Sequence, residues 1–211
     1  ENTENQLRML PYMQETYEIN DQTTYLITSE GEIPLMIMGG CMESLSGAKW
    51  ICQNMGVDEQ DFYEAIATFE GVKNYLEKEQ LSDNFILIKD NAQKPKEVQF
   101  SITTVKEQYP TYSLTTCMEI QEEMILEELL SSSKVFNKAD KVVIYTPLSS
   151  QRERIKEVFP LSEIYTDKDD FQSYIYQKNP RKKEILLFMS KDSYANIDFG
   201  LFSEIIASQP K

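Results

Sequence analysis

The sequence predicts an α/β fold: a doubly wound, mostly parallel, Rossmann-like sheet preceded by a small segment of β-hairpin and helices. Short apolar runs such as Phe85–Lys89 and Glu184–Met189 alternate with amphipathic stretches of about 10 to 15 residues. Strands that are apolar throughout are buried on both faces, which parallel sheets achieve by covering each face with helices. No internal repeat or low-complexity tract indicates another architecture.

The first part of the chain, residues 1–80, is predicted to contain the hairpin. Thr24–Thr28 and Ile33–Met38 are rich in β-formers, and Ser29–Glu32 between them supplies turn chemistry.

Two helices are predicted to follow the hairpin. Apolar residues of the first recur at helical spacing and are expected to face the core; they are Leu45, Ala48, Ile51, Cys52 and Met55. Gly56 ends this helix, and Asp58 is placed to cap a second one that runs to Phe69.

A domain boundary is expected near Leu81, where residues 81–211 begin to alternate strands with helices. The predicted strands are Phe85–Lys89, Ser113–Met118, Lys141–Tyr145, Glu184–Met189 and a weaker one at Glu163–Tyr165. The predicted helices are Pro95–Gln108, Glu122–Phe136, Gln151–Val158, Asp169–Gln177 and Leu201–Ala207.

The charge balance limits the partners. The chain has 35 acidic and 21 basic residues, an excess that opposes attraction to nucleic acid or to an anionic membrane surface. The longest apolar runs fall short of the roughly 20 residues that cross a bilayer. The polar stretch Glu1–Gln6 does not read as a signal peptide, so a cytoplasmic location is expected.

Several kinds of catalytic chemistry lack their usual residues. The chain has no histidine, which excludes histidine-based triads and zinc sites. Its three cysteines, Cys41, Cys52 and Cys117, are irregularly spaced and are expected to be reduced and mostly buried. Neither GxxxxGK[ST] nor GxGxxG occurs. We therefore expect no catalytic residue, no metal site and no cofactor bound by this chain alone.

The candidate substrate-binding residues follow the predicted strands, because ligands of open parallel sheets bind beyond the carboxyl ends of the strands. They are Asp90, Asn91, Lys94, Glu119, Ser190, Lys191 and Asp192. Asp90, the two lysines and Glu119 also have purely structural interpretations. An aspartate is equally typical of a strand-to-helix turn, and an isolated lysine is typical of solvated surface. Glu119, with Glu122 and Glu123, suits Mg²⁺, but acidic residues also favour a helix start, and we prefer that explanation.

Two segments of the first part carry a resemblance to a known family. Pro34–Ala48 has the layout of a strand, a glycine turn and an HNxxN-type helix start, with the histidine and asparagines replaced. Phe62–Lys73 is similar to a segment that leads to an FxGVxRR motif, but Asn74 and Tyr75 stand in place of the arginines. In these segments the chain resembles the Mur ligases, the bacterial ATP-dependent amide-forming enzymes of cell-wall synthesis, and among them the muramate:alanine and murein peptide ligases.

The later part resembles the same family. Lys89–Pro95 matches the DDYAHHP motif without its histidines, and Asn137–Tyr145 looks like the ADxVxx strand. Met189–Asp198 is similar to the final substrate loop without its glycines. The resemblance implies that residues 1–80 are a remnant of the family's central domain and that residues 81–211 are its C-terminal Rossmann-like domain.

In the family, the last domain closes over ATP and the incoming amino acid or peptide, and ATP and Mg²⁺ are the cofactors. The resemblance thus implies an amino acid, a peptide or a UDP-muramoyl compound as ligand, and a missing N-terminal part of a longer chain, carrying the phosphate loop, as partner. We interpret this chain as a divergent Mur-ligase-like region that does not ligate by itself and retains at most binding. One alternative is a fragment of an active ligase whose front half supplies the ATP loop.

A second alternative is a receiver-like or protein-interaction α/β module. Ile86–Asn91 and Ser190–Lys191 mimic the first strand and the late lysine of receiver domains, but Val142–Pro147 offers no aspartate to accept a phosphoryl group.

Overall fold

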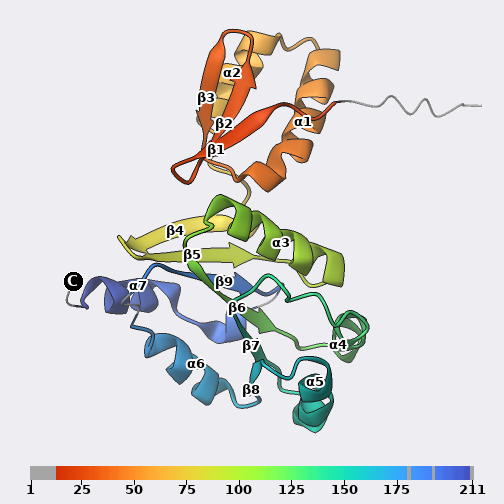
Figure 1. Cartoon of the computed structure of the whole chain (residues 1–211), viewed down its shortest axis with the longest axis vertical. Coiled ribbons are helices and arrows are strands. Elements are labelled where there is room, and N and C mark those ends of the chain that lie inside the picture. The colour runs from red at the N-terminus through yellow and green to blue at the C-terminus, as the bar shows by residue number, and fades with distance from the viewer. Residues whose placement is uncertain (1–12, 180–181, 192, 210–211) are drawn as a thin grey trace, which may run out of the picture. The chain divides into compact units, whose positions relative to one another are not determined.

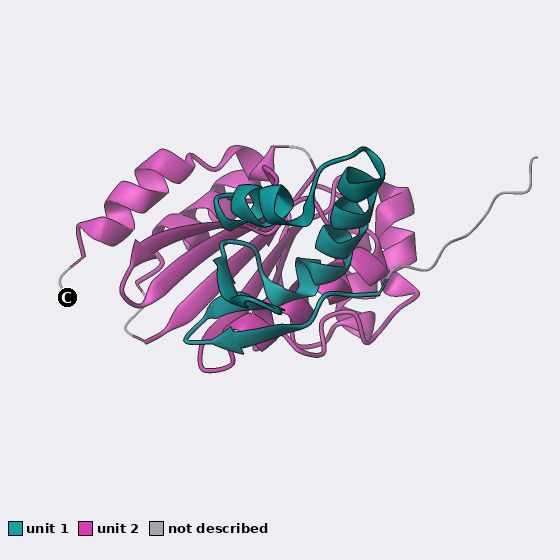
Figure 2. Cartoon of the chain, turned by 90° about the horizontal axis from the view of Figure 1, so that it is seen from above, with its two compact units in different colours: residues 1–70 teal, residues 71–211 magenta. Residues whose placement is uncertain are grey.

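The computed structural model describes residues 13–179, 182–191 and 193–209 of the chain (Figure 1). It divides into two compact units, residues 1–70 and 71–211, which Figure 2 shows in different colours. The division falls earlier than the boundary expected near Leu81. The reason is that Glu77–Ser82 forms a strand, β4, that pairs with the sheet of the second unit.

The first unit begins with a three-stranded antiparallel sheet in the order β1-β2-β3. Its strands are β1 (Tyr17–Asn20), β2 (Thr23–Thr28) and β3 (Gly31–Leu35). The β2–β3 hairpin confirms the prediction, whereas β1 was not predicted. Asp21 and Gln22 join β1 to β2 with φ angles of 47° and 67°, the left-handed pair that matches a two-residue hairpin turn to the twist of its strands.

Two helices, α1 (Met42–Asn54) and α2 (Glu59–Ala67), complete the first unit after the 3₁₀ turn η1 (Gly39–Cys41). The Asp58 carboxylate accepts a hydrogen bond from the Asp61 N–H at 2.9 Å, which confirms the predicted cap of α2. Gly56 ends α1 with a φ of 92°, as expected. The core of the unit consists of Leu26, Leu35, Met42, Leu45 and Phe62.

The prediction that one apolar stripe of α1 faces the core is wrong for most of that stripe. Leu45 is buried, but Ala48 is exposed, and Ile51 and Met55 are 54% and 79% exposed. The strands of this unit are only four to six residues long. So small a sheet covers one side of α1, the side that carries Met42, Leu45, Ser46 and Lys49.

The second unit is built on a six-stranded sheet in the order β4-β5-β9-β6-β7-β8. β4 is antiparallel to β5, and the other neighbours are parallel, which confirms the predicted fold class. The strands are β4 (Glu77–Ser82), β5 (Phe85–Asp90), β6 (Ser113–Glu119), β7 (Lys141–Tyr145), β8 (Glu163–Tyr165) and β9 (Glu184–Met189). The five predicted strands are present, and β4 adds an unpredicted edge.

Helices cover both faces of this sheet (Figure 1). On one side lie α3 (Pro95–Gln108), α4 (Glu123–Leu130) and α5 (Arg152–Val158), which follows η2 (Ser149–Gln151); on the other lie α6 (Lys168–Tyr176) and α7 (Phe199–Ala207). Under α6 and α7 the sheet packs an aromatic core in which Phe171 and Phe202 meet Phe85 and Phe188. Helix α4 ends before the expected Phe136. Within the described ranges, no helix combines the length and apolarity needed to cross a membrane.

Phe202 tests the packing of α7 on the sheet. Its side chain is fully buried, and its ring meets that of Phe85 edge-on with centroids 5.9 Å apart. Phe202→Ala is expected to lower the free energy of unfolding by about 3–5 kcal/mol, because it leaves a cavity in a close-packed core. Leu201→Ala is the control, since Leu201 is 46% exposed on the same helix. Urea unfolding followed by circular dichroism measures both, and equal losses would contradict the packing described.

Candidate functional site

The candidate site lies where β9 passes between β5 and β6. Met189 is in register with Asp90 on one side and with Met118 on the other, so the three strands end at the same edge. β5 and β6 lead into α3 and α4 on one face of the sheet, whereas β9 leads into α7 on the opposite face. Such a change of direction is a topological switch point, the place where open parallel sheets bind ligands.

Asp90 ends β5, and its side chain is almost completely buried. One carboxylate oxygen accepts hydrogen bonds from the N–H groups of Asn91 at 3.0 Å and Leu76 at 3.4 Å, and the other accepts from the Ser101 hydroxyl. Burial raises the pKa of Asp90 above its ordinary value, although these hydrogen bonds partly offset the effect. The carboxylate therefore joins the start of β4 and helix α3 to the end of β5.

Glu119 and Ser190 form a second buried pair, contributed by the ends of β6 and β9. The Ser190 hydroxyl donates a hydrogen bond to the Glu119 carboxylate, whose other oxygen accepts one from the Gln121 amide at 2.7 Å. The Ser190 N–H donates to the main-chain carbonyl of Asp90 at 3.0 Å. The network thus connects all three strand ends.

A left-handed turn, η3 (Tyr194–Asn196), follows β9 at this edge. Its three residues have φ angles of 51°, 53° and 54°, a conformation that is unfavourable for residues other than glycine. The Tyr194 N–H donates to the Ser190 hydroxyl oxygen at 3.3 Å, and the Tyr194 hydroxyl donates to the Asp90 carbonyl at the same distance. Gln172 of α6 donates to the Ala195 carbonyl at 2.8 Å. Burial raises the pKa of Tyr194 to about 12, so its hydroxyl remains a donor.

The structure thus brings together three of the predicted site residues, Asp90, Glu119 and Ser190. Asn91 takes part through its main chain, and its side chain is exposed. The side chains of Lys94 and Lys191 are also exposed, outside the hydrogen bonds described for the buried group. Asp192 lies outside the described residues.

Sequence reasoning missed Ser101, Gln121 and Tyr194. For Ser101 a signal was present, because this serine lies among the apolar residues that α3 buries, and a buried hydroxyl requires a partner. Gln121 and Tyr194 carry no comparable signal.

The described residues contain no group of three or more Asp, Glu or Cys side chains arranged to hold a metal ion. Glu123 instead occupies the first turn of α4, where its carboxylate accepts a hydrogen bond from Gln151 at 3.0 Å. That position agrees with the helix-start interpretation of the acidic residues after β6.

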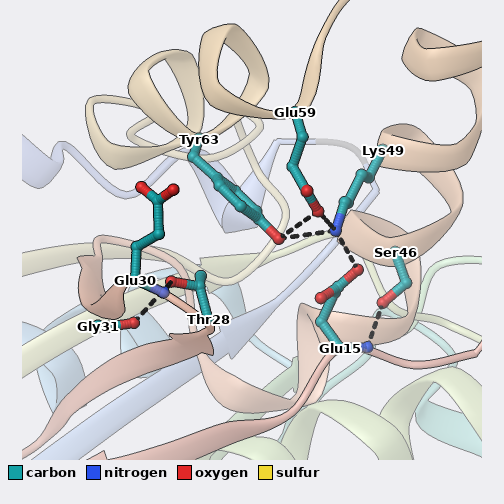
Figure 3. A network of polar contacts seen from close by, with 8 residues as sticks. All are labelled: Glu15, Thr28, Glu30, Gly31, Ser46, Lys49, Glu59 and Tyr63. Carbon is teal, nitrogen blue, oxygen red and sulfur yellow. Dashed lines mark hydrogen bonds and ion pairs between the residues drawn. The ribbon is translucent and has the colours of Figure 1, made fainter.

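The first unit contains a different polar network, centred on Lys49 of α1 (Figure 3). The ammonium group donates to Glu15 at 2.8 Å and to the Tyr63 hydroxyl at 2.7 Å, and it pairs with Glu59 at 2.6 Å. Burial opposes the charge, but the three hydrogen bonds together outweigh it and raise the pKa of Lys49. Because both acids and the tyrosine bind Lys49, we interpret the network as a structural one that joins the segment before β1 to α1 and α2.

The fold of this chain, a small antiparallel unit followed by a doubly wound sheet, is similar to that of a class of solved ligases. The UDP-N-acetylmuramate-alanine ligase MurC of Thermotoga maritima aligns with a TM-score of 0.75 at 14% identity, over 94% of this chain and 46% of that one. The MurF ligase of the same organism, solved in complex with ADP, aligns with a TM-score of 0.61 at 14% identity, over 92% and 46% of the two chains.

Sequence comparison agrees with this class. The bifunctional enzyme MurC/Ddl of Chlamydia pneumoniae is 26% identical over 161 residues, which are 75% of this chain and 20% of that enzyme. The MurC/Ddl of Chlamydia trachomatis is 22% identical over 175 residues, or 82% and 20% of the two chains. No protein-family model matches the chain.

The chain is thus similar to Mur ligases in sequence and in fold. It spans about a fifth of the length of the curated relatives that it matches.

The buried charge of Asp90 gives the protein a defined pH dependence. Because its pKa is raised in the folded state, folding favours protonation, and stability increases as the pH falls from neutral towards that raised pKa. Asp90→Asn keeps an oxygen for the two N–H donors, and its amide can donate to Ser101, which also donates to the Glu97 carbonyl at 3.0 Å. We expect the variant to be more stable at pH 7 by on the order of 1 kcal/mol.

Urea unfolding at pH 7 and pH 5 tests this prediction. The advantage of Asp90→Asn over the unmodified protein is expected to shrink at pH 5, where the aspartate is closer to being protonated. A variant that is markedly less stable than the unmodified protein at pH 7 would show that the charge itself is required.

Ser190 is expected to be essential to the strand-end network. Ser190→Ala removes a donor to buried Glu119 and an acceptor for the Tyr194 N–H, which should lower the free energy of unfolding by about 1–3 kcal/mol. Ser193→Ala is the matched control, since Ser193 is exposed and its replacement should change stability by less than about 0.5 kcal/mol. A neutral Ser190→Ala would mean that the network does not stabilise the edge.

Proposed function

We propose that this chain is the later part of a Mur-ligase-type fold, that it does not catalyse ATP-dependent ligation by itself, and that it contributes a binding surface for an amino acid, a peptide or a UDP-muramoyl compound. In this proposal the chain alone binds neither ATP nor Mg²⁺. The fold similarity to MurC over 94% of the chain supports the lineage.

The proposal that the chain does not catalyse ligation by itself rests on the burial and hydrogen bonding of Asp90 and Glu119. Both carboxylates are buried at the switch point, and both accept hydrogen bonds from donors of this chain: Ser101 for Asp90, and Ser190 for Glu119. Carboxylates satisfied in this way hold strands together and have little remaining capacity to orient a cation or an amine. The sequence also supplies neither a phosphate loop nor a histidine base.

Binding is assigned to the exposed rim around these buried groups. Lys94 and Lys191 present ammonium groups and Asn91 presents an amide, a set suited to the carboxylate of an amino acid or peptide or to a phosphate. Exposed ion pairs contribute up to about 1 kcal/mol each. The few contacts of the rim sum to about 2–3 kcal/mol, so the rim alone supports weak binding, with a dissociation constant on the order of 10 mM.

A second candidate function is suggested by how little of its relatives' length the chain covers. The chain matches 46% of the solved MurC and 20% of each MurC/Ddl relative, which is also what a fragment of an active ligase would show. In that alternative an N-terminal half of the ligase binds ATP. The rim residues of this chain then line the part of the active site that binds the amino acid.

Release of ADP in the presence of ATP, Mg²⁺, UDP-N-acetylmuramate and amino acids separates the proposals. The chain alone is expected to release no ADP above the buffer background, and release by the chain alone would contradict the proposal. Release by a longer gene product, but not by this chain, would identify a fragment of an active ligase.

Titration calorimetry with amino acids, short peptides and UDP-N-acetylmuramate tests the rim. Lys191→Ala is expected to weaken binding by about fivefold, the worth of one exposed ion pair. Lys182→Ala is the matched control, because Lys182 is also exposed but precedes β9, whereas Lys191 follows it. Equal effects of the two variants, or no saturable binding at all, would contradict a rim site.

A further inference from the structure

Three consecutive residues of the second unit, Tyr194, Ala195 and Asn196 of η3, have a left-handed backbone. Glycine and single asparagines tolerate this conformation, whereas for other residues it lowers the population by a factor of about five to thirty. Tyr194 and Ala195 therefore carry a conformational cost that Asn196 largely avoids. Strain of this kind persists only where surrounding contacts impose it, and it concentrates in switch regions and binding sites.

Helix α6 supplies contacts that impose the conformation from outside the turn. The Gln172 amide donates to the Ala195 carbonyl at 2.8 Å and to the Asn196 carbonyl at 3.3 Å. Four residues further along the helix, the Tyr176 hydroxyl accepts a hydrogen bond from the Asp198 N–H at 2.8 Å. Residues four apart lie on the same face of a helix. One face of α6 therefore holds both η3 and the residue that caps α7.

Tyr194 connects the other side of η3 to the strand ends. Its N–H donates to the Ser190 hydroxyl oxygen and its own hydroxyl donates to the Asp90 carbonyl, both at 3.3 Å. Both distances exceed the usual ranges for N–H and O–H donors, so these hydrogen bonds are weak. The ring of Tyr194 packs edge-on against Phe188 and Phe199, with centroids 5.8 and 5.5 Å away. Aromatic packing thus favours the closed turn, whereas the two hydrogen bonds add little.

We infer that η3 is a two-state latch at the strand-end edge, closed in its left-handed form and open when Tyr194 and Ala195 relax to a right-handed backbone. Opening removes one donor from the Ser190 hydroxyl oxygen and one from the Asp90 carbonyl. The Glu119 carboxylate accepts from the same Ser190 hydroxyl. These groups are acceptors, so the open edge suits a ligand group that only donates. A protonated primary amine offers three N–H donors and no acceptor.

The amine is the part of an amino acid or peptide that the open edge would take, a step that rests on the proposed function. The rim residues Lys94 and Lys191 are suited to the carboxylate of such a ligand, which leaves its amine for the acceptors. A ligand shifts a conformational equilibrium only if it binds one form better than the other. In the closed form Tyr194 occupies the acceptors, so the amine and the closed turn compete.

Amide hydrogen exchange measured by NMR tests the latch without a ligand. Two N–H groups report on η3, because each donates within the turn: Asn196 to the Ser193 carbonyl at 2.8 Å, and Ile197 to the Tyr194 carbonyl at 3.1 Å. Both are expected to exchange through a local opening, and therefore faster than the amides of the central strand β9. If both amides exchange only as fast as those of β9, the turn has no separate open state and the inference fails.

A matched pair of variants tests the role of α6. Gln172→Glu removes the amide donor and should lower the protection factors of Asn196 and Ile197 about fivefold. Gln177→Glu is the control, since it makes the same change at an exposed position at the end of the same helix. Ala195→Gly should raise both protection factors about fivefold, because glycine adopts a left-handed backbone without that cost. Equal values in the two glutamate variants, or lower protection in Ala195→Gly, would overturn the inference.

Tyr176→Phe gives a second way to release the turn, should Gln172→Glu fail to fold. The change removes only the hydroxyl that accepts from the Asp198 N–H, so the fold is expected to survive. Circular dichroism checks the folding of every variant. Protection at Asn196 and Ile197 should again fall about fivefold. Protection equal to that of the unmodified protein would show that α6 does not hold the latch.

Glycylglycine and N-acetylglycylglycine separate the latch from the proposed function. Both peptides have a carboxylate, but only the first has a protonated amine. At a concentration equal to its dissociation constant, glycylglycine should lower the protection of Asn196 and Ile197 about twofold, and the acetylated peptide should not. Binding of both peptides with unchanged protection contradicts the amine step. No saturable binding of either contradicts the proposed function, whereas the effect of Gln172→Glu without ligand would still support the latch.

Discussion

The hydrogen-bonding of β9 to both β5 and β6 is the constraint on which the second unit depends. β9 is the last of the described strands but lies inside the sheet, so the parallel order is complete only when this segment has been inserted. Its insertion places Ser190 between Asp90 and Glu119, residues far apart in the sequence. It also reverses the direction in which the chain leaves the sheet, since β9 leads to α7 while its neighbours lead to the opposite face. The switch point and the hydrogen bonds of Ser190 to Glu119 and Asp90 are consequences of this single pairing.

Burial then determines what these polar groups do. An unsatisfied buried donor or acceptor costs roughly 1–3 kcal/mol, so each group at the strand ends must find a partner inside the protein or in a ligand. Here the partners come from the chain itself: Ser101 for Asp90, and Ser190 with Gln121 for Glu119. The left-handed turn at Tyr194 is held by the same network, which offsets a conformation that non-glycine residues disfavour. Because their hydrogen bonds are made within the chain, the polar groups at this edge of the sheet stabilise the fold and have little capacity left to bind a ligand.

The sequence predicted those features that local pattern determines. The predictions of the apolar strands of the second unit and of the Asp58 cap were correct. Burial on both faces requires a continuous apolar run, and a helix cap requires a particular residue type, so both can be recognised in the sequence. β4 was missed because its sequence, Glu77–Ser82, is that of a charged edge strand. The three buried site residues were expected at the strand ends, but their hydrogen-bond partners were not. The pairing of Ser190 with Glu119 depends on the position of β9, which no local pattern encodes.

The error over α1 has a different cause. A periodic apolar pattern predicts which side chains face a core, but it does not encode how much of the helix circumference the neighbouring elements cover. The pattern and the structure agree for Leu45 and disagree for Ile51 and Met55. Lys49 makes the disagreement sharper. Its charge, which is usually found at the surface, is turned inward and neutralised by two acids, while apolar side chains face outward. The three partners of Lys49 within the first unit, Glu15, Glu59 and Tyr63, determine which side of α1 turns inward.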